Sequence, residues 1–100
     1  MLIHSVYFWL KPEHQTDEDR ARFLEGLSTL ARLEMAQACY IGTPARMAPR
    51  PVVDPTYDYA LTLVFKSLAE HDVYQVSPIH KAFVETCVPM THRIVIYDAD

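Results

Sequence analysis

The 100-residue sequence has only two glycines and two cysteines, and no apolar run approaches the roughly 18 residues of a membrane span. Two isolated glycines cannot form a glycine-rich phosphate-binding loop. Cys39 and Cys87 lie far apart and form no CxxC, which predicts two reduced, largely buried thiols in a cytoplasmic protein. The apolar first ten residues lack a basic leader, so they predict a strand rather than a signal peptide. We therefore expect no membrane partner.

Charged residues are also scarce, at 22% of the chain, and the formal net charge is −4. The nine basic residues are dispersed, whereas a nucleic-acid surface concentrates them on one face, so no nucleic-acid partner is expected. No two histidines have HxxxH or HxH spacing, and His14, His71 and His92 are predicted at exposed or terminal positions, which predicts no metal site and no cofactor. Half of the residues are hydrophobic, which predicts a single folded domain over residues 1–100.

Two segments of the sequence, 2–10 and 57–65, have the composition of strands that are apolar on both faces. Side chains alternate across a strand, so a sheet with one wet face should alternate between apolar and polar residues. Helical sequence suffices to cover only one face of such a sheet, and we expect the other face to meet a second copy of the chain. The residues predicted at this dimer interface are Ile3, Tyr7, Trp9, Ala60, Thr62 and Val64.

The remaining segments complete a β-α-β-β-α-β order. Thr16, followed by three acidic residues, predicts the start of an amphipathic helix of about 17 residues. Ser67 and Ser77-Pro78 predict two short helices separated by a kink. Weaker strands are expected at 36–43 and 92–97, and the proline-rich segment 44–56 is either an exposed spacer or a lid. The predicted class is α+β, a ferredoxin-like four-stranded antiparallel sheet with helices on one face.

Several titratable side chains fall in apolar surroundings and predict a pocket on the helix-covered face. His80 lies near the start of a helix, where the helix dipole and burial disfavour the charged imidazole, so it is suited to act as a general base. Tyr74 could orient it or donate to an oxyanion. In the alternative interpretation, His80 bonds to backbone near the kink and Tyr74 reaches solvent. The expected pocket lining comprises His4, Val6, Phe8, Leu24, Leu27, Tyr59 and Leu61.

These residues resemble the stress-responsive A/B barrel (Dabb) family of dimeric α+β barrels. The resemblance rests on the opening strand LIHSVYFWL, the segment YDYALTLVF, the terminal IVIYD and the segment Tyr74–His80, which is similar to the family's Tyr-x-x-His-Pro-x-His signature. It implies a ferredoxin-like subunit and a homodimeric barrel. One plant branch of the family resembles a cofactor-free polyketide cyclase. The catalytic Tyr and His of that branch match Tyr74 and His80 here, and a histidine that lines its pocket matches His4. Ser77 replaces a further family histidine.

The sequence leaves four hypotheses about function open. The first is a small homodimeric protein that binds an apolar or aromatic small molecule. The second is a cofactor-independent lyase or cyclase in which His80 is the base and Tyr74 its catalytic partner. The third is a structural dimer whose pocket is filled by its own side chains, and a heme- or quinone-type monooxygenase is a remote fourth. The volume of the pocket distinguishes the third hypothesis from the others, because a pocket under about 100 Å³ would favour the third, whereas ligand sites usually have about 300 Å³ or more.

Overall fold

A computed structural model describes all of residues 1–100 and contains one four-stranded antiparallel sheet with strand order β2-β3-β1-β4. The expected ferredoxin-like β-α-β-β-α-β order is confirmed, with the second helix broken in two. Short 3-10 helices also occur at Pro12–His14 and Val88–Met90. The elements are β1 Leu2–Leu10, α1 Asp17–Ala31, β2 Ala38–Gly42, β3 Tyr59–Phe65, α2 Leu68–Gln75, α3 Pro78–Cys87 and β4 Thr91–Ala99.

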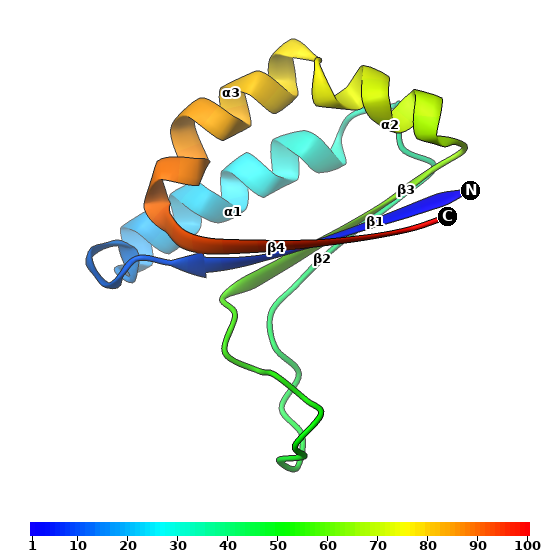
Figure 1. The fold of residues 1–100 in the computed structure, drawn as a ribbon. Helices are drawn as coiled ribbons and strands as arrows, with labels where there is room; N and C mark the ends of the chain where they lie inside the picture. The colour runs from blue at the N-terminus through cyan, green and yellow to red at the C-terminus, as the bar shows by residue number, and fades with distance from the viewer.

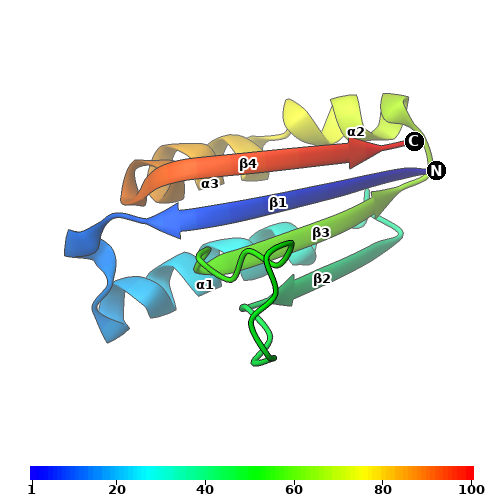
Figure 2. The same ribbon diagram turned by 60° about the horizontal axis from the view of Figure 1, so that its bottom comes forward.

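The helices form one layer that covers a single face of the sheet (Figure 1). The long connection between β2 and β3 leaves the sheet on the opposite side, where Figure 2 shows it in front of the strands. The helix-free face of the sheet is therefore covered only in part, by the connection between β2 and β3.

None of the helices has both the length and the apolar character needed to cross a bilayer.

Local sequence signals account for the starts of all three α-helices. The hydroxyl oxygens of Thr16, Ser67 and Ser77 accept hydrogen bonds from backbone N–H groups three residues later, as the N-cap pattern predicts. Pro78 occupies the first turn of α3, where its missing N–H leaves no intrahelical bond unmade. β4 continues two residues beyond the expected end at Tyr97, because its pairing with β1 extends to the Ile3–Ala99 pair.

The hydrophobic core lies between the sheet and the helix layer. Alternate residues of β1 and β3 are buried against the helices, and the register places Val6 opposite both Leu61 and Ile96. From α1, the fully buried residues are Phe23, Leu27 and Leu30. Leu24, expected on the same stripe, is instead 40% exposed. Burial of these apolar side chains is the main term that stabilises the subunit.

Gly26 is the point of closest approach between α1 and α3. A Cβ atom at this position would overlap the Cys87 sulfur and touch the Phe83 ring at 3.4 Å. We therefore expect Gly26→Ala to lower the free energy of unfolding by about 1–3 kcal/mol, because overpacking outweighs the roughly 1 kcal/mol gain in helix propensity. Urea denaturation measures the change.

The cause of this loss can be checked in two ways. In a Cys87→Ala background, Gly26→Ala should cost little or even stabilise, because the clashing sulfur is gone. Gly42→Ala is the matched control, since no atom lies within 4 Å of a Cβ built there, and it should change stability by no more than about 0.5 kcal/mol. Equal losses at both glycines would contradict the packing explanation.

Candidate functional site

A cavity of about 180 Å³ lies between the sheet and the layer formed by α2 and α3. The structure brings together in this cavity six of the residues expected there, contributed by β1, β3, α2 and α3. They are His4, Val6, Phe8, Leu61, Tyr74 and His80. The other lining residues are Leu30, Gln75, Phe83, Val84, Val88, Ile94 and Ile96.

Three expected lining residues lie elsewhere. Leu24 turns toward solvent, because the inward-facing positions of α1 are taken by its neighbours, and Leu27 is buried in the core without reaching the cavity. Tyr59 stacks on Phe23 with ring centroids 5.5 Å apart, and its hydroxyl donates to the Arg20 carbonyl at 3.4 Å. The cavity therefore lies closer to α3 and β4 than the sequence pattern indicated, and β4 supplies two lining residues, Ile94 and Ile96, that the sequence pattern did not predict.

Tyr74 and His80 lie edge to face at one wall of the cavity. Their ring centroids are 4.8 Å apart with an interplanar angle of 68°. The kink between α2 and α3 produces this approach, because Ser77 caps α3 through the His80 backbone N–H at 3.2 Å and Pro78 occupies the first turn. Tyr74 is almost fully buried, so the alternative interpretation, in which its side chain reaches solvent, is wrong for this residue.

The two side chains have shifted pKa values that suit opposite roles. Burial lowers the pKa of His80, and the neighbouring His4 and His71 lower it further against an opposing backbone interaction with Gln75. Burial raises the pKa of Tyr74 well above its usual value, with a smaller contribution from Cys39. A neutral imidazole that can accept a proton therefore lies beside a hydroxyl that keeps its own.

We expect the His80 imidazole to titrate below its ordinary pKa of about 6.5 in an NMR pH titration. The same imidazole in the urea-unfolded chain is the reference. Because the folded pKa is the lower one, His80 contributes stability that is complete above about pH 6.5 and is lost as the pH falls through the folded pKa. A folded midpoint equal to or above the unfolded one would contradict the neutral-base assignment.

A second group of polar side chains adjoins the cavity through His4. The His4 Nδ1 atom lies 2.5 Å from an Asp98 carboxylate oxygen. The His71 ring lies 4.9 Å from the His4 ring, centroid to centroid, and its side chain is only 13% exposed. The expectation that His71 is exposed is therefore wrong. The reason is that α2 turns it toward β1 and Phe65, where it packs edge-on.

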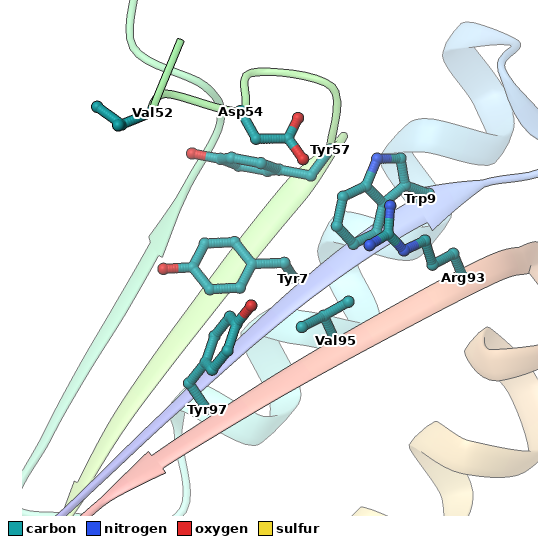
Figure 3. Close-up of a pocket in the computed structure, with 8 residues that line it drawn as sticks. All are labelled: Tyr7, Trp9, Val52, Asp54, Tyr57, Arg93, Val95 and Tyr97. Carbon is teal, nitrogen blue, oxygen red and sulfur yellow. The ribbon is translucent and has the colours of Figure 1, made fainter.

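A larger cavity of about 360 Å³ lies on the opposite face of the sheet, under the connection between β2 and β3 (Figure 3). Thr56 of this connection accepts a hydrogen bond from the Trp9 indole N–H at 2.9 Å, and the Tyr57 ring meets Tyr7 edge to face at 5.1 Å. The proline-rich segment is therefore packed on the sheet at its second end. The lining residues are Tyr7, Trp9, Val52, Asp54, Tyr57, Arg93, Val95 and Tyr97.

The residues around this cavity bury one of the side chains that were expected at the dimer interface. Trp9 is buried even in the single chain, where only 8% of it is exposed. Thr56 and Tyr57 cover it, and the Arg93 guanidinium lies 4.3 Å from its ring. Ile3, in contrast, is 41% exposed at the other end of the same strand. The remaining expected interface residues, Tyr7, Ala60, Thr62 and Val64, are half-buried.

Solved structures with the same fold come from several organisms. An Arabidopsis thaliana protein, refined as a crystal ensemble, has a TM-score of 0.82 and 16% identity over 100% of this chain and 94% of its own. A Thermobifida fusca protein described as dimeric and ferredoxin-like has a TM-score of 0.74 and 19% identity over 98% and 88%. A hydroxynitrile lyase from Passiflora edulis has a TM-score of 0.75 and 18% identity over 98% and 90%.

At these identities the likeness concerns the fold. No curated protein sequence matches the chain. The family model described as Stress responsive A/B Barrel Domain, abbreviated Dabb, matches residues 2–100, which is nearly the whole sequence. The match includes the strand that carries His4 and the kinked helix pair that carries Tyr74 and His80. The chain belongs to the stress responsive A/B barrel (Dabb) family.

Proposed function

We propose that the chain forms a single-domain homodimer through the helix-free face of its sheet. Ile3 and the Tyr40 and Tyr97 side chains are exposed on this face, which is mostly apolar along the central strands apart from the Ser5–Thr62 pair. A soluble monomer rarely leaves a contiguous apolar patch of this kind in water. The similar Thermobifida fusca protein is itself described as dimeric. The cytoplasmic location expected from the two free cysteines is part of the same proposal.

We further propose that each subunit binds an apolar or aromatic small molecule in the 180 Å³ cavity. The observation that carries this proposal is the pairing of His80 with Tyr74 in a cavity whose other walls are mostly aliphatic and aromatic. The volume is below that of drug-sized sites, but an apolar cavity of about 150 Å³ is large enough for benzene. The expected ligand is therefore about the size of one aromatic ring, with one polar group that meets the imidazole or the hydroxyl.

Native mass spectrometry of the purified protein tests ligand binding. A bound small molecule should appear as an added mass on the chain, and Val6→Phe should remove it. Val6 is buried and lines the cavity, so a phenyl ring at this position fills the volume. Circular dichroism checks that the variant is folded. An adduct of unchanged occupancy on folded Val6→Phe would place the ligand elsewhere.

A second candidate function is a cofactor-independent lyase, in which His80 is the base and Tyr74 donates to a developing oxyanion. Two observations favour it: the lowered pKa of His80, and the similar Passiflora edulis protein, which is a hydroxynitrile lyase. In such a reaction His80 would accept the hydroxyl proton of a hydroxynitrile. The bond to the nitrile carbon would then break, which releases a carbonyl compound and cyanide.

Turnover of mandelonitrile, followed by benzaldehyde absorbance, tests this second function. His80→Ala should abolish turnover while the dimer remains intact, and His92→Ala on the exposed edge strand is the matched control. Absence of turnover by the unmodified protein, or full activity of His80→Ala, would exclude this reaction at the site. If His80 is structural instead, His80→Ala should lower the melting temperature, because a buried partner loses an interaction of roughly 1–3 kcal/mol.

A further inference from the structure

Two histidines and one aspartate from three different elements meet at the end of the sheet nearest α2. They are His4 of β1, His71 of α2 and Asp98 of β4. We propose that they form a binding site for a divalent first-row transition metal, with Zn²⁺ as the ion that the site fits best. No local motif in the sequence indicates such a site, because the three residues are separated by 67 and 27 positions.

The geometry of the three side chains supports one shared ion. One potential ligand atom from each residue lies within 4.8 Å of the other two. Ligand atoms about 2.0–2.1 Å from a tetrahedral Zn²⁺ lie roughly 3.4 Å apart, so His4 Nδ1 and the Asp98 carboxylate oxygen, which are 2.5 Å apart, must separate by about 1 Å to admit an ion. Asp98 can make this movement, because its side chain is 41% exposed near the end of an edge strand, whereas His4 is held in the core.

Hydrogen bonds already orient His71 as a metal ligand. Its Nδ1 atom lies 3.2 Å from an Asp72 carboxylate oxygen, and its Nε2 atom lies 3.2 Å from the Gln75 side-chain amide. Metal-binding histidines usually donate their second N–H to a carboxylate, which fixes the tautomer and leaves the other nitrogen free to coordinate. With the proton on Nδ1, Nε2 presents its lone pair, and the Gln75 amide is the group that an ion would displace.

The donor set indicates the class of metal. Two imidazole nitrogens and one carboxylate suit Zn²⁺, Co²⁺ and Ni²⁺, whereas Mg²⁺ and Ca²⁺ prefer sites made of oxygen atoms alone. Three protein ligands also leave one position for water or another small ligand. His4 lines the 180 Å³ cavity as well, so this position lies next to it. The metal site does not depend on the proposed dimer or on the proposed small-molecule ligand.

Titration of the untagged full-length chain with Co²⁺ tests the proposal, because tetrahedral Co²⁺ absorbs visible light. We expect one Co²⁺ per chain, displaced by Zn²⁺. His71→Gln and Asp98→Asn should each weaken the affinity at least tenfold, and Asp72→Asn should weaken it about tenfold through the lost orientation of His71. The matched controls are His92→Gln and Asp100→Asn, which alter exposed residues outside the group and should leave the affinity unchanged.

Circular dichroism establishes that each variant is folded before its affinity is compared. Isothermal titration with Zn²⁺ gives the same stoichiometry independently of the absorbance. The proposal is overturned if the unmodified chain binds no Co²⁺ at 1 mM free metal, a concentration that corresponds to roughly 4 kcal/mol of binding free energy. It is equally overturned if folded His71→Gln and Asp98→Asn bind as tightly as the unmodified chain.

Discussion

Replacing Ile3 by aspartate should convert the proposed homodimer to a monomer, which changes the mass in multi-angle light scattering at micromolar concentration from twice 11.5 kDa to 11.5 kDa. Ile3 is 41% exposed in the single chain and lies on the helix-free face of β1, next to Val64 of β3. The subunit tolerates a carboxylate there because the position is wet. In the dimer the same carboxylate would be buried between two apolar faces without a partner.

A matched control separates the interface from a general effect of charge. Val76 is also exposed, but it lies between α2 and α3 on the helix layer, so Val76→Asp should remain a dimer. Trp9→Asp, which is also expected to lose the dimer or the fold, is less informative. It removes the bond to Thr56 and the contact with Arg93 within one chain. A dimeric Ile3→Asp variant would contradict the assignment of this face.

Removing the Asp58 carboxylate should cost about 2–4 kcal/mol of unfolding free energy. Asp58 accepts hydrogen bonds from the Leu10 backbone N–H at 2.7 Å, from Gln15 at 3.2 Å and from Arg20 at 2.9 Å. It therefore ties the ends of β1 and β3 to the start of α1. In Asp58→Ala these donors lose their acceptor, and the melting temperature should fall by roughly 10 °C or more.

The acid side of the stability curve provides the second check on Asp58. Burial raises its pKa, but the bonds from Leu10, Arg20 and Gln15 outweigh burial, and the net pKa is below the ordinary value. The ionised Asp58 carboxylate therefore contributes its full stabilisation of the fold above about pH 3.9, and this stabilisation is lost as the pH falls through the folded pKa. Asp58→Ala should lose less stability between pH 5 and pH 2 than the unmodified chain. Asp100→Ala, at an exposed position, should follow the unmodified curve, and identical slopes for all three proteins would contradict this role.

Short-range signals explain why the elements of the fold could be predicted from the sequence. Thr16, Ser67 and Ser77-Pro78 are N-cap and first-turn residues, and each acts within one helical turn. The alternation along β1 and β3 likewise depends only on neighbouring positions. These signals are local, so they remain valid whatever the tertiary arrangement is.

The composition of the site depended on tertiary packing and could be predicted only in part. His4, Tyr74 and His80 were recognisable because each is a polar residue on an otherwise apolar face. The sequence could not predict that Leu30 lines the cavity and Leu24 does not. Both leucines fit the same apolar stripe of the helix, and only the docking of α1 on the sheet decides which of them faces inward. The proximity of His71 to His4 depends on how α2 turns against β1, which no local pattern encodes.

The packing of the proline-rich segment was the other feature that sequence could not provide. Its prolines correctly indicate that it is not a central strand. Whether such a segment is a free spacer or covers a surface depends on single distant contacts. Here the contacts are those of Thr56 and Tyr57 with Trp9 and Tyr7.

Protein-observed NMR with phenol as the probe tests ligand binding in the cavity most directly. Phenol combines one aromatic ring with one hydroxyl, which matches the volume of the cavity and the His80–Tyr74 pair at its wall. We expect saturable shifts of the His80 ring and the Val84 methyl signals, with the Trp9 indole signal unchanged and with both shifts abolished in folded Val6→Phe. Shifts confined to Trp9, or none at millimolar phenol, would contradict the proposed binding site.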